Sequence, residues 1–187
     1  MGYEQIRVMD ELSRSVQRAG GVSLQRQATL GELVKSIAAQ RGICRPKDLI
    51  SEEPTRHEVR VGDQSLYTYC FMDALMLPFV FRDQPVEVHS TSPDGGAVTA
   101  LVTQEGVKGS PPEAVISFGA ARSGDGPTHA TFCPYLNAFT SRDDYERWAE
   151  RTPQAETIAL SMTEAFNLAR DWTSAPAGGS GGGTYHC

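Results

Sequence analysis

The stretch SLYTYCFMDALMLPFVF, residues 65–81, is the densest apolar block of the chain and decides what fold is expected. Its length and its content of Ala, Leu and Met favour a buried helix that ends near Pro78. A strand is expected shortly before it, because HEVRV, residues 57–61, alternates between polar and apolar side chains. A strand followed by a buried helix is therefore expected in this part of the chain.

More strands are expected further along the chain. Residues 85–91 and 96–103 alternate between apolar and polar side chains, and the turn-forming sequence Ser-Pro-Asp-Gly lies between them. Two alternating runs joined by turn residues predict a β-hairpin. Residues 114–118 and 157–160 are shorter apolar runs that we also interpret as strands.

Helices are expected on both sides of this β-rich middle. Apolar residues at helical spacing predict an amphipathic helix over residues 3–19. A second helix is expected after the capping-box pair Thr29 and Glu32, and another after the pair Ser161 and Glu164. Helices, then strands, then helices make α+β the expected fold class.

The length of 187 residues fits one ordinary domain. We expect a small N-terminal helical segment and linker over residues 1–56, a core over 57–173 and a flexible Gly/Ser tail over 174–187. Residues 43–56, within the linker, are polar and contain prolines, so they are expected to form a loop. In this arrangement the helical segment packs on a β-rich core that has flanking helices.

Charge and hydropathy exclude some partners. Lys and Arg number 17 and Asp and Glu number 23, which gives a net charge of −6 and disfavours nucleic acid as a partner. The longest apolar run, residues 75–81, is far shorter than the span of about 20 residues that crosses a membrane. The first residues mix charged and apolar side chains, unlike a signal peptide. We therefore expect a cytoplasmic protein with reduced thiols and no membrane partner.

Cysteine spacing excludes two kinds of site. The four cysteines are Cys44, Cys70, Cys133 and Cys187; they lie far apart and form no Cys-x-x-Cys pair. Such a pattern is too sparse for a disulfide scaffold and wrong for a zinc site built from neighbouring residues.

Asp73 is the most unusual residue of the apolar block, because it lies three positions after Cys70. Positions i and i+3 share one face of a helix, so the thiol and the carboxyl group are expected to be neighbours. An apolar setting raises the pKa of a carboxyl group, which suits a group that accepts and donates protons near neutral pH. If Cys70 lies in the first helical turn, the positive end of the helix favours its thiolate. The alternatives are a buried structural cysteine and an aspartate that caps a loop or pairs with an arginine.

Cys133 is followed by Pro134, which donates no backbone hydrogen bond and suits a strand end or a loop beside a cavity. A core cysteine between two aromatic residues is the alternative. Only the fold could bring Cys133 to the distant Cys70. With Asp73, two thiolates would form a site for soft ions such as Hg(II), Cu(I) and Zn(II).

Three segments, in this order along the chain, resemble the organomercurial lyases, also called alkylmercury lyases. The first matches that family's Leu-Tyr-x-x-Cys-x-x-Asp-x-Leu pattern with its following Leu-Pro step, and the second matches the Thr-Phe-Cys around the family's second cysteine. The third, residues 157–172, is similar to the strand and helix at the family's end, and the whole similarity covers about residues 57–172. The motif residues of the first two segments are Leu66, Tyr67, Cys70, Asp73, Leu75 and Pro78, then Thr131, Phe132 and Cys133.

The resemblance implies protonolysis of a carbon–mercury bond. Cys70 and Cys133 would take mercury from R–Hg⁺, and Asp73 would accept a thiol proton and deliver it to the departing carbon. The products would be R–H and Hg(II) held by Cys70, Cys133 and Asp73. No organic cofactor would be required, and small cytosolic thiols or a mercuric reductase would accept the Hg(II).

Two other functions remain open at this point. One is a non-catalytic carrier or sensor of mercury or copper on the same fold, and the other is a lyase for a different organometal. The end of the chain, Tyr185-His186-Cys187, is either a tethered thiol that passes mercury in or out, or a disordered terminus. Cys44 is expected to be a bystander.

Overall fold

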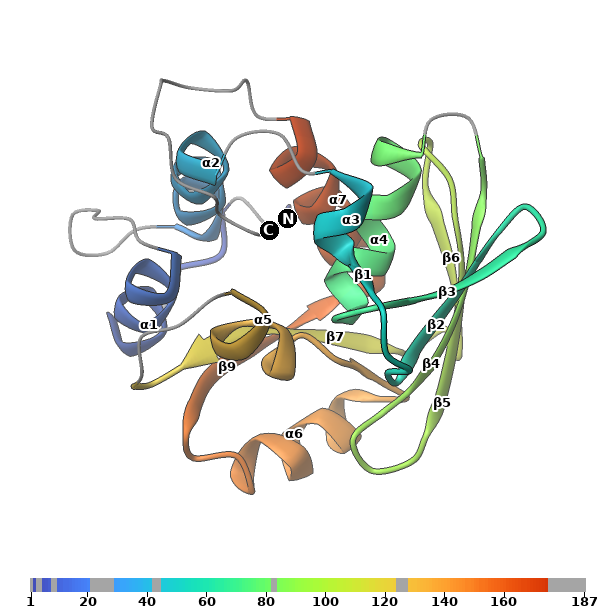
Figure 1. The fold of residues 1–187 in the computed structure, drawn as a ribbon. Coiled ribbons are helices and arrows are strands. Elements are labelled where there is room, and N and C mark those ends of the chain that lie inside the picture. Colours follow the sequence, from blue (N-terminus) through green and yellow to red (C-terminus); the bar gives the residue numbers. More distant parts are fainter. Residues whose placement is uncertain are drawn as a thin grey trace.

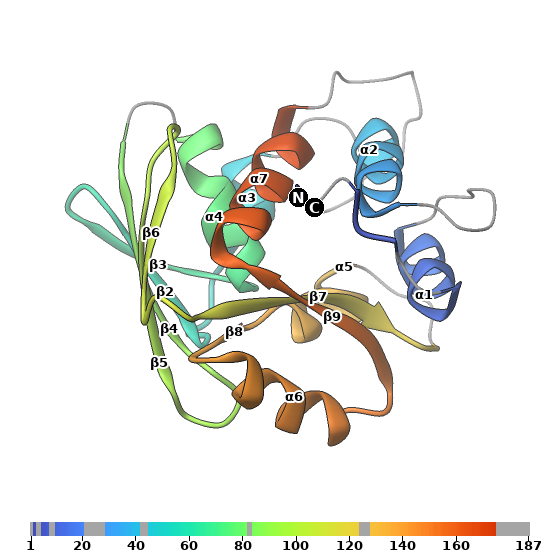
Figure 2. The same cartoon turned by 180° about the vertical axis from the view of Figure 1, so that it is seen from behind.

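The fold is known from a computed structural model, which describes residues 2, 5–7, 10–20, 29–41, 45–81, 84–123 and 128–174. Two antiparallel sheets meet helices on several sides, and the N-terminal helices lie at the end of the molecule opposite the larger sheet (Figures 1 and 2). The predicted α+β class is confirmed. Among the described residues, no helix combines the length and the apolar character needed to cross a bilayer.

The larger sheet has six strands in the order β1-β3-β2-β4-β5-β6. Its strands are β1 (Ile50–Ser51), β2 (His57–Val61), β3 (Gln64–Thr68), β4 (Val86–Thr91), β5 (Ala97–Val102) and β6 (Val107–Ser110). The predicted strand at 57–61 and the predicted hairpin are confirmed, because β4 and β5 pair in antiparallel register around a turn that contains Gly95. That glycine has a φ of 93°, a conformation that side chains with a Cβ rarely adopt. Strand β6 was not expected from the sequence.

The smaller sheet has three strands in the order β8-β7-β9. They are β7 (Val115–Ala121), β8 (Ala138–Phe139) and β9 (Ala155–Ser161). Both strands predicted in this part of the chain are confirmed, and both are longer than expected. Every side chain of β7 is buried, so this central strand is covered on both faces.

The helices are α1 (Asp10–Gly20), α2 (Leu30–Arg41), α3 (Pro46–Leu49), α4 (Phe71–Val80), α5 (Thr128–Thr131), α6 (Arg142–Glu150) and α7 (Met162–Ser174), with a 3-10 turn, η2 (Cys133–Tyr135). Both capping boxes form: the Thr29 N–H donates to Glu32 at 2.7 Å, and the Ser161 N–H donates to Glu164 at 2.8 Å. Helix α4 packs against α7 and against β2 and β4 of the larger sheet.

The apolar block at 65–81 is not one helix, contrary to the prediction. Residues 64–68 form β3, because this segment pairs with β2 through a turn at Gly62, whose φ is 57°. Helix α4 begins at Phe71 and continues past Pro78, since the Phe81 N–H bonds to the carbonyl oxygen of Leu77 at 2.7 Å. A strand partner elsewhere in the chain thus decides the first third of the block.

Two further expectations need correction. The helix predicted over 3–19 is described only from Asp10, and the Ile6 carbonyl instead accepts a hydrogen bond from Leu30 at 2.9 Å. The loop predicted over 43–56 contains α3 and β1, because Pro46 presets the first turn of α3 and the Arg45 N–H bonds to Asp48.

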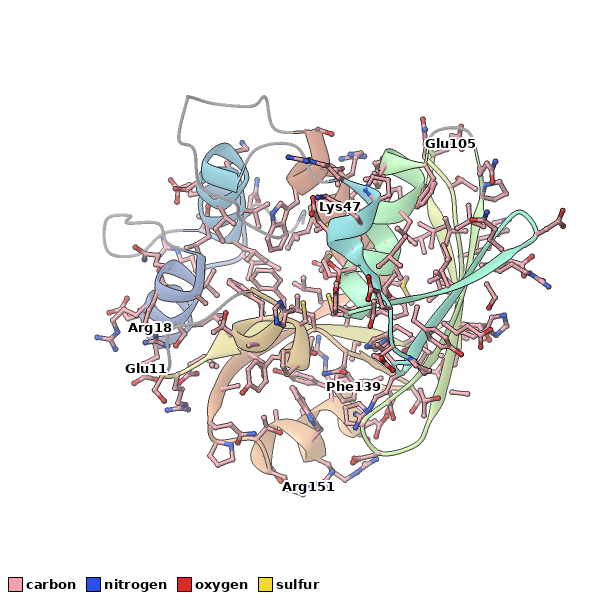
Figure 3. All side chains as sticks on the ribbon, in the orientation of Figure 1. Glu11, Arg18, Lys47, Glu105, Phe139 and Arg151 are labelled. Atoms are coloured by element: carbon pink, nitrogen blue, oxygen red, sulfur yellow. The ribbon has the colours of Figure 1, made fainter. Side chains whose placement is uncertain are left out.

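Buried apolar side chains from α1, α2, α4, α7 and both sheets form one continuous cluster. Side chains fill the space between the layers, and charged residues such as Glu11, Arg18, Lys47, Glu105 and Arg151 lie at the periphery, in contrast to the interior Phe139 (Figure 3). The domain limits of 1–56, 57–173 and 174–187 stay a prediction.

Candidate active site

The first turn of α4 holds the predicted pair of a thiol and a carboxylate. Cys70 is the N-cap residue, in extended conformation, and its N–H donates to Asp73 Oδ2 at 3.1 Å. An acidic side chain in this position is favourable because the helix N-terminus carries partial positive charge. Thr68 fixes the preceding turn by donating its hydroxyl to the Cys70 carbonyl oxygen at 2.9 Å. The predicted proximity is confirmed, although Cys70 precedes the helix and does not lie on its face.

Cys133 begins the 3-10 turn η2, in which Pro134 occupies the first turn. Two polar residues hold this turn against β7. The buried Ser117 hydroxyl donates to the Tyr135 carbonyl oxygen at 2.8 Å and accepts from the Asn137 N–H at 2.9 Å. The Asn137 amide in turn donates to the Pro134 carbonyl oxygen at 2.8 Å. The position of Cys133 is therefore set by hydrogen bonds that close on the turn from both ends.

A backbone hydrogen bond joins the two cysteine segments. The Phe71 N–H, at the start of α4, donates to the Leu136 carbonyl oxygen, just after η2, at 3.0 Å. The Cys133 sulfur then lies 3.9 Å from Asp73 Oδ2. One ligand atom each from Cys70, Asp73 and Cys133 lie within 4.8 Å of one another, and all three residues are buried. The fold brings together the three residues that the sequence singled out.

Burial controls the protonation of Cys70. Desolvation raises the pKa of this thiol well above its ordinary value, and the Cys133 side chain and the Asp73 charge raise the pKa further. The Asp73 N–H, at the helix N-terminus, opposes this effect without reversing it. The helix end thus favours the thiolate as expected, but burial outweighs it, and the net effect is a raised pKa of the Cys70 thiol.

A cavity of about 510 Å³ opens onto this cluster from one side. The residues that line it are Pro54, Thr55, Arg56, His57, Tyr69, Cys133, Pro134 and Asn137. Cys133 lies in the cavity wall, as its neighbouring proline suggested, whereas Cys70 is fully buried and does not line it. A molecule in the cavity therefore meets the Cys133 sulfur before the Cys70 sulfur.

Sequence reasoning missed the residues around this cavity. His57 is buried, its Nδ1 lies 2.8 Å from the Ser90 hydroxyl, and burial with the nearby Arg56 charge lowers its pKa to about 4. Tyr69 stacks on His129 with ring centroids 5.8 Å apart. The alternation of HEVRV does indicate that His57 faces inward, but nothing local indicates that it borders a cavity shared with Cys133.

Two thiols and one carboxylate form a ligand set for a soft metal ion. Among the described residues, Cys70, Asp73 and Cys133 are the side chains whose ligand atoms lie close enough together to hold one metal ion. Neither Cys70 nor Cys133 forms a disulfide bond. Cys44 and Cys187 lie outside the described residues, so their predicted roles as bystander and tethered thiol stay predictions.

Comparisons with known proteins agree on one family. An alkylmercury lyase of Streptomyces lividans is 28% identical over 129 residues, which are 67% of this chain and 58% of that protein. An alkylmercury lyase of Staphylococcus epidermidis is 27% identical over 120 residues, 63% of this chain and 53% of that protein. The chain thus spans a little more than half the length of these relatives.

A solved structure of the mercury-bound form of MerB2 has a similar fold. Its TM-score is 0.56 at 19% identity, and the match covers 89% of this chain and 82% of that one. At this identity the likeness concerns the fold alone. Residues 50–174 match the family model described as MerB, alkylmercury lyase. This match covers both cysteine segments and all strands of the two sheets, and the chain belongs to the alkylmercury lyase family.

Proposed function

We propose that this protein is a carbon–mercury lyase that converts R–Hg⁺ into R–H and Hg(II). The observation that carries the proposal is the buried cluster of Cys70, Asp73 and Cys133, whose ligand atoms lie within 4.8 Å of one another beside a cavity. A pure metal carrier needs the two thiols but has no use for a buried proton carrier between them.

Capture begins at the cavity wall. The Cys133 sulfur attacks the mercury of R–Hg–X, the Hg–X bond breaks, and the thiol proton leaves with X as HX. Cys133 then holds R–Hg through one sulfur–mercury bond. Cys133 takes this first role because it borders the cavity, whereas Cys70 is fully buried behind it.

Cleavage then uses the second thiol and the carboxylate. Cys70 passes its proton to the Asp73 carboxylate, and its sulfur forms a second bond to mercury. The Asp73 carboxyl group delivers that proton to the carbon as the carbon–mercury bond breaks. The products are R–H and Hg(II) bound by two thiolates, with Asp73 again ionised, so protons and charge balance.

The site fits the demands of this reaction. A carbanion is a very poor leaving group in water, so the carbon must be protonated as it leaves. Two soft sulfur donors on mercury weaken the bond to carbon, and a carboxyl group held in place supplies the proton without a collision from solvent. The Cys70 N–H and the Cys133 thiol both contact Asp73 Oδ2, which holds the carboxylate close to both sulfurs.

The same proposal covers the need for a cofactor, the acceptor of the Hg(II) and the third ligand of the product. The three side chains supply every proton and ligand of the cycle, so no organic cofactor is required. Hg(II) would leave by exchange with small thiols of the cytoplasm or with a mercuric reductase. Asp73 would be a third ligand of the Hg(II) product.

Turnover assays test this function. Phenylmercury is incubated with the full chain and excess small thiol, and benzene is measured. We expect turnover by the wild type and by the controls Cys44→Ser and Asp63→Asn, and loss of turnover in Cys70→Ala, Cys133→Ala and Asp73→Ala. Tight Hg(II) binding by the wild type without benzene release would refute the lyase and indicate a carrier.

A further inference from the structure

The cavity beside Cys133 contains one permanent cation that the proposed chemistry does not use. Among the described residues that line it, Arg56 is the one lysine or arginine, and no carboxylate lines it. His57, in the same wall, does not add positive charge near neutral pH, because its pKa is about 4. The residues that line the cavity thus carry one positive charge, at Arg56, and the Asp73 carboxylate lies behind the wall at Cys133.

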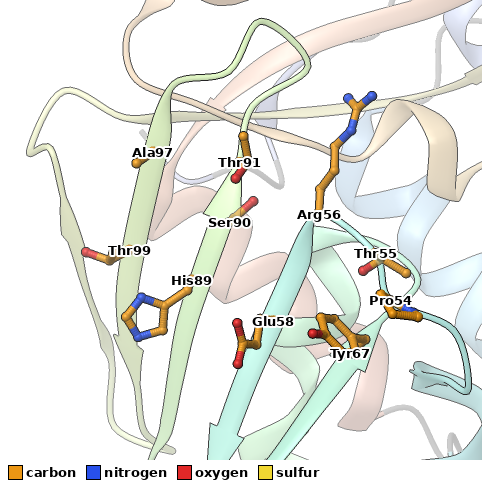
Figure 4. Close-up of a pocket in the computed structure, with 10 residues that line it drawn as sticks. All are labelled: Pro54, Thr55, Arg56, Glu58, Tyr67, His89, Ser90, Thr91, Ala97 and Thr99. Carbon is orange, nitrogen blue, oxygen red and sulfur yellow. The ribbon is translucent and has the colours of Figure 1, made fainter.

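The Arg56 guanidinium is not neutralised by an ion pair among the described residues. Arg60 pairs with Glu87 and Arg151 pairs with Asp94, whereas Arg56 pairs with no carboxylate of the described residues. Arg56 also borders a second hollow of about 320 Å³ on the outer face of the larger sheet. Figure 4 shows its side chain extended beyond the end of β2, at the boundary of that hollow. Its guanidinium is therefore available to a ligand in either space.

The other walls fit a small, flat organic group. Tyr69 is 37% exposed and is held in place by stacking on His129. Pro54 and Pro134 add rigid apolar surface. A volume of about 510 Å³ lies within the range of roughly 300–1,000 Å³ that small-molecule sites occupy.

We propose that Arg56 binds the carboxylate of a small ligand whose soft atom, mercury or sulfur, reaches Cys133. The ligand class is carboxylate-bearing arylmercurials, or carboxylate-bearing thiols that remove the product Hg(II). The inference rests on the proposed function, because that function gives the ligand its soft atom. A guanidinium binds a carboxylate through paired, charge-assisted hydrogen bonds, which a lysine reproduces only in part.

The test measures mercury capture and mercury release separately from carbon–mercury cleavage. The full chain with Cys44→Ser and Cys187→Ser is used, so that Cys70 and Cys133 are its remaining thiols. The first arm compares the rate constants for capture of 4-chloromercuribenzoate and of phenylmercury, followed by loss of free thiol. The second arm compares 3-mercaptopropionate with 2-mercaptoethanol in removing bound Hg(II).

Arg56→Gln is expected to lower the preference for the carboxylated ligand roughly three- to tenfold, the range of an ordinary net hydrogen bond, because solvent screens the charge of an exposed side chain. Arg56→Lys should retain part of it. The matched control is Arg60→Gln, on strand β2, which begins directly after Arg56; Arg60 pairs with Glu87, and its loss should leave both preferences unchanged. Because Arg56 has an exposed side chain, neither substitution at this position removes core packing.

An effect in the first arm identifies the organic group of the mercurial as the source of the carboxylate, and an effect in the second arm identifies the acceptor thiol. Equal preferences in Arg56→Gln and the parent chain, in both arms, would overturn the inference. Failure of the proposed function would appear differently, as absence of hydrocarbon from every variant, while the capture ratio still reports on Arg56.

Discussion

Asp73→Asn separates the proton carrier from the rest of the site. Asparagine has the size of aspartate, and its side-chain oxygen can still accept the Cys70 N–H, which donates to Asp73 at 3.1 Å. The amide cannot take the Cys70 proton or deliver one to carbon. Both thiols remain, so mercury capture at the cavity wall should persist while cleavage fails.

The expected losses of cleavage rate and of stability follow from the role and the position of Asp73. General acid–base catalysis contributes about 10²–10⁴-fold, so we expect benzene release from bound phenylmercury to slow at least about 100-fold. The lost charge at the helix N-terminus costs stability of about 0.3–1 kcal/mol, small beside the 5–15 kcal/mol of a typical domain. The variant should therefore stay folded, and the loss of rate should not reflect unfolding.

A single-turnover assay measures both steps. Equimolar phenylmercury is mixed with protein, capture is followed by loss of free thiol, and benzene is followed over time. Asp48→Asn is the matched control, because Asp48 accepts the Arg45 N–H at 3.0 Å in the same geometry at the start of α3. Benzene release by Asp73→Asn within about threefold of wild type would refute the role of Asp73 as proton carrier.

Three other predictions concern the surroundings of the cluster. Ser117→Ala leaves the Asn137 N–H without its serine partner, which should lower the free energy of unfolding by about 1–3 kcal/mol. We expect a lower melting temperature and slower mercury capture at Cys133. An unchanged capture rate would contradict the role of Ser117 in positioning Cys133. Because the pKa of His57 is lowered to about 4, its contribution to stability is present above pH 6.5 and is lost as pH falls toward 4. Denaturant titrations should therefore show that the free energy of unfolding falls by roughly 3 kcal/mol more over this pH range in the wild type than in His57→Gln. The same dependence of the unfolding free energy on pH in both proteins would refute this prediction. Iodoacetamide should alkylate Cys133 well before Cys70, since burial raises the pKa of the Cys70 thiol; peptide mapping with Cys70 modified first would be the opposite result.

Sequence patterns predicted the structure correctly where it depends on interactions between residues close together in the chain. The capping boxes at Thr29 and Ser161 and the turn at Gly95 involve residues within a few positions of each other, and each forms as predicted. The proximity of Cys70 and Asp73 belongs to the same kind, because three residues of spacing at a helix start bring their side chains together.

Where the sequence predictions were wrong or incomplete, contacts between distant segments of the chain determine the structure. Residues 65–68 belong to the block whose overall composition predicted a helix, yet pairing with β2 makes them part of strand β3. The approach of Cys133 depends on the hydrogen bond between Phe71 and Leu136, segments that no local pattern relates. The raised pKa of Cys70 reflects complete burial, which outweighs the helix end that spacing alone suggested.

The most direct test of the account is one turnover in D₂O without any added thiol or cofactor. The full chain receives one equivalent of phenylmercury, and benzene, protein mass and free thiols are measured. The account predicts one equivalent of monodeuterated benzene, a protein that has gained mercury alone, and the loss of both the Cys70 and the Cys133 thiols. A protein that has gained an intact phenylmercury group, with no benzene released, would contradict it.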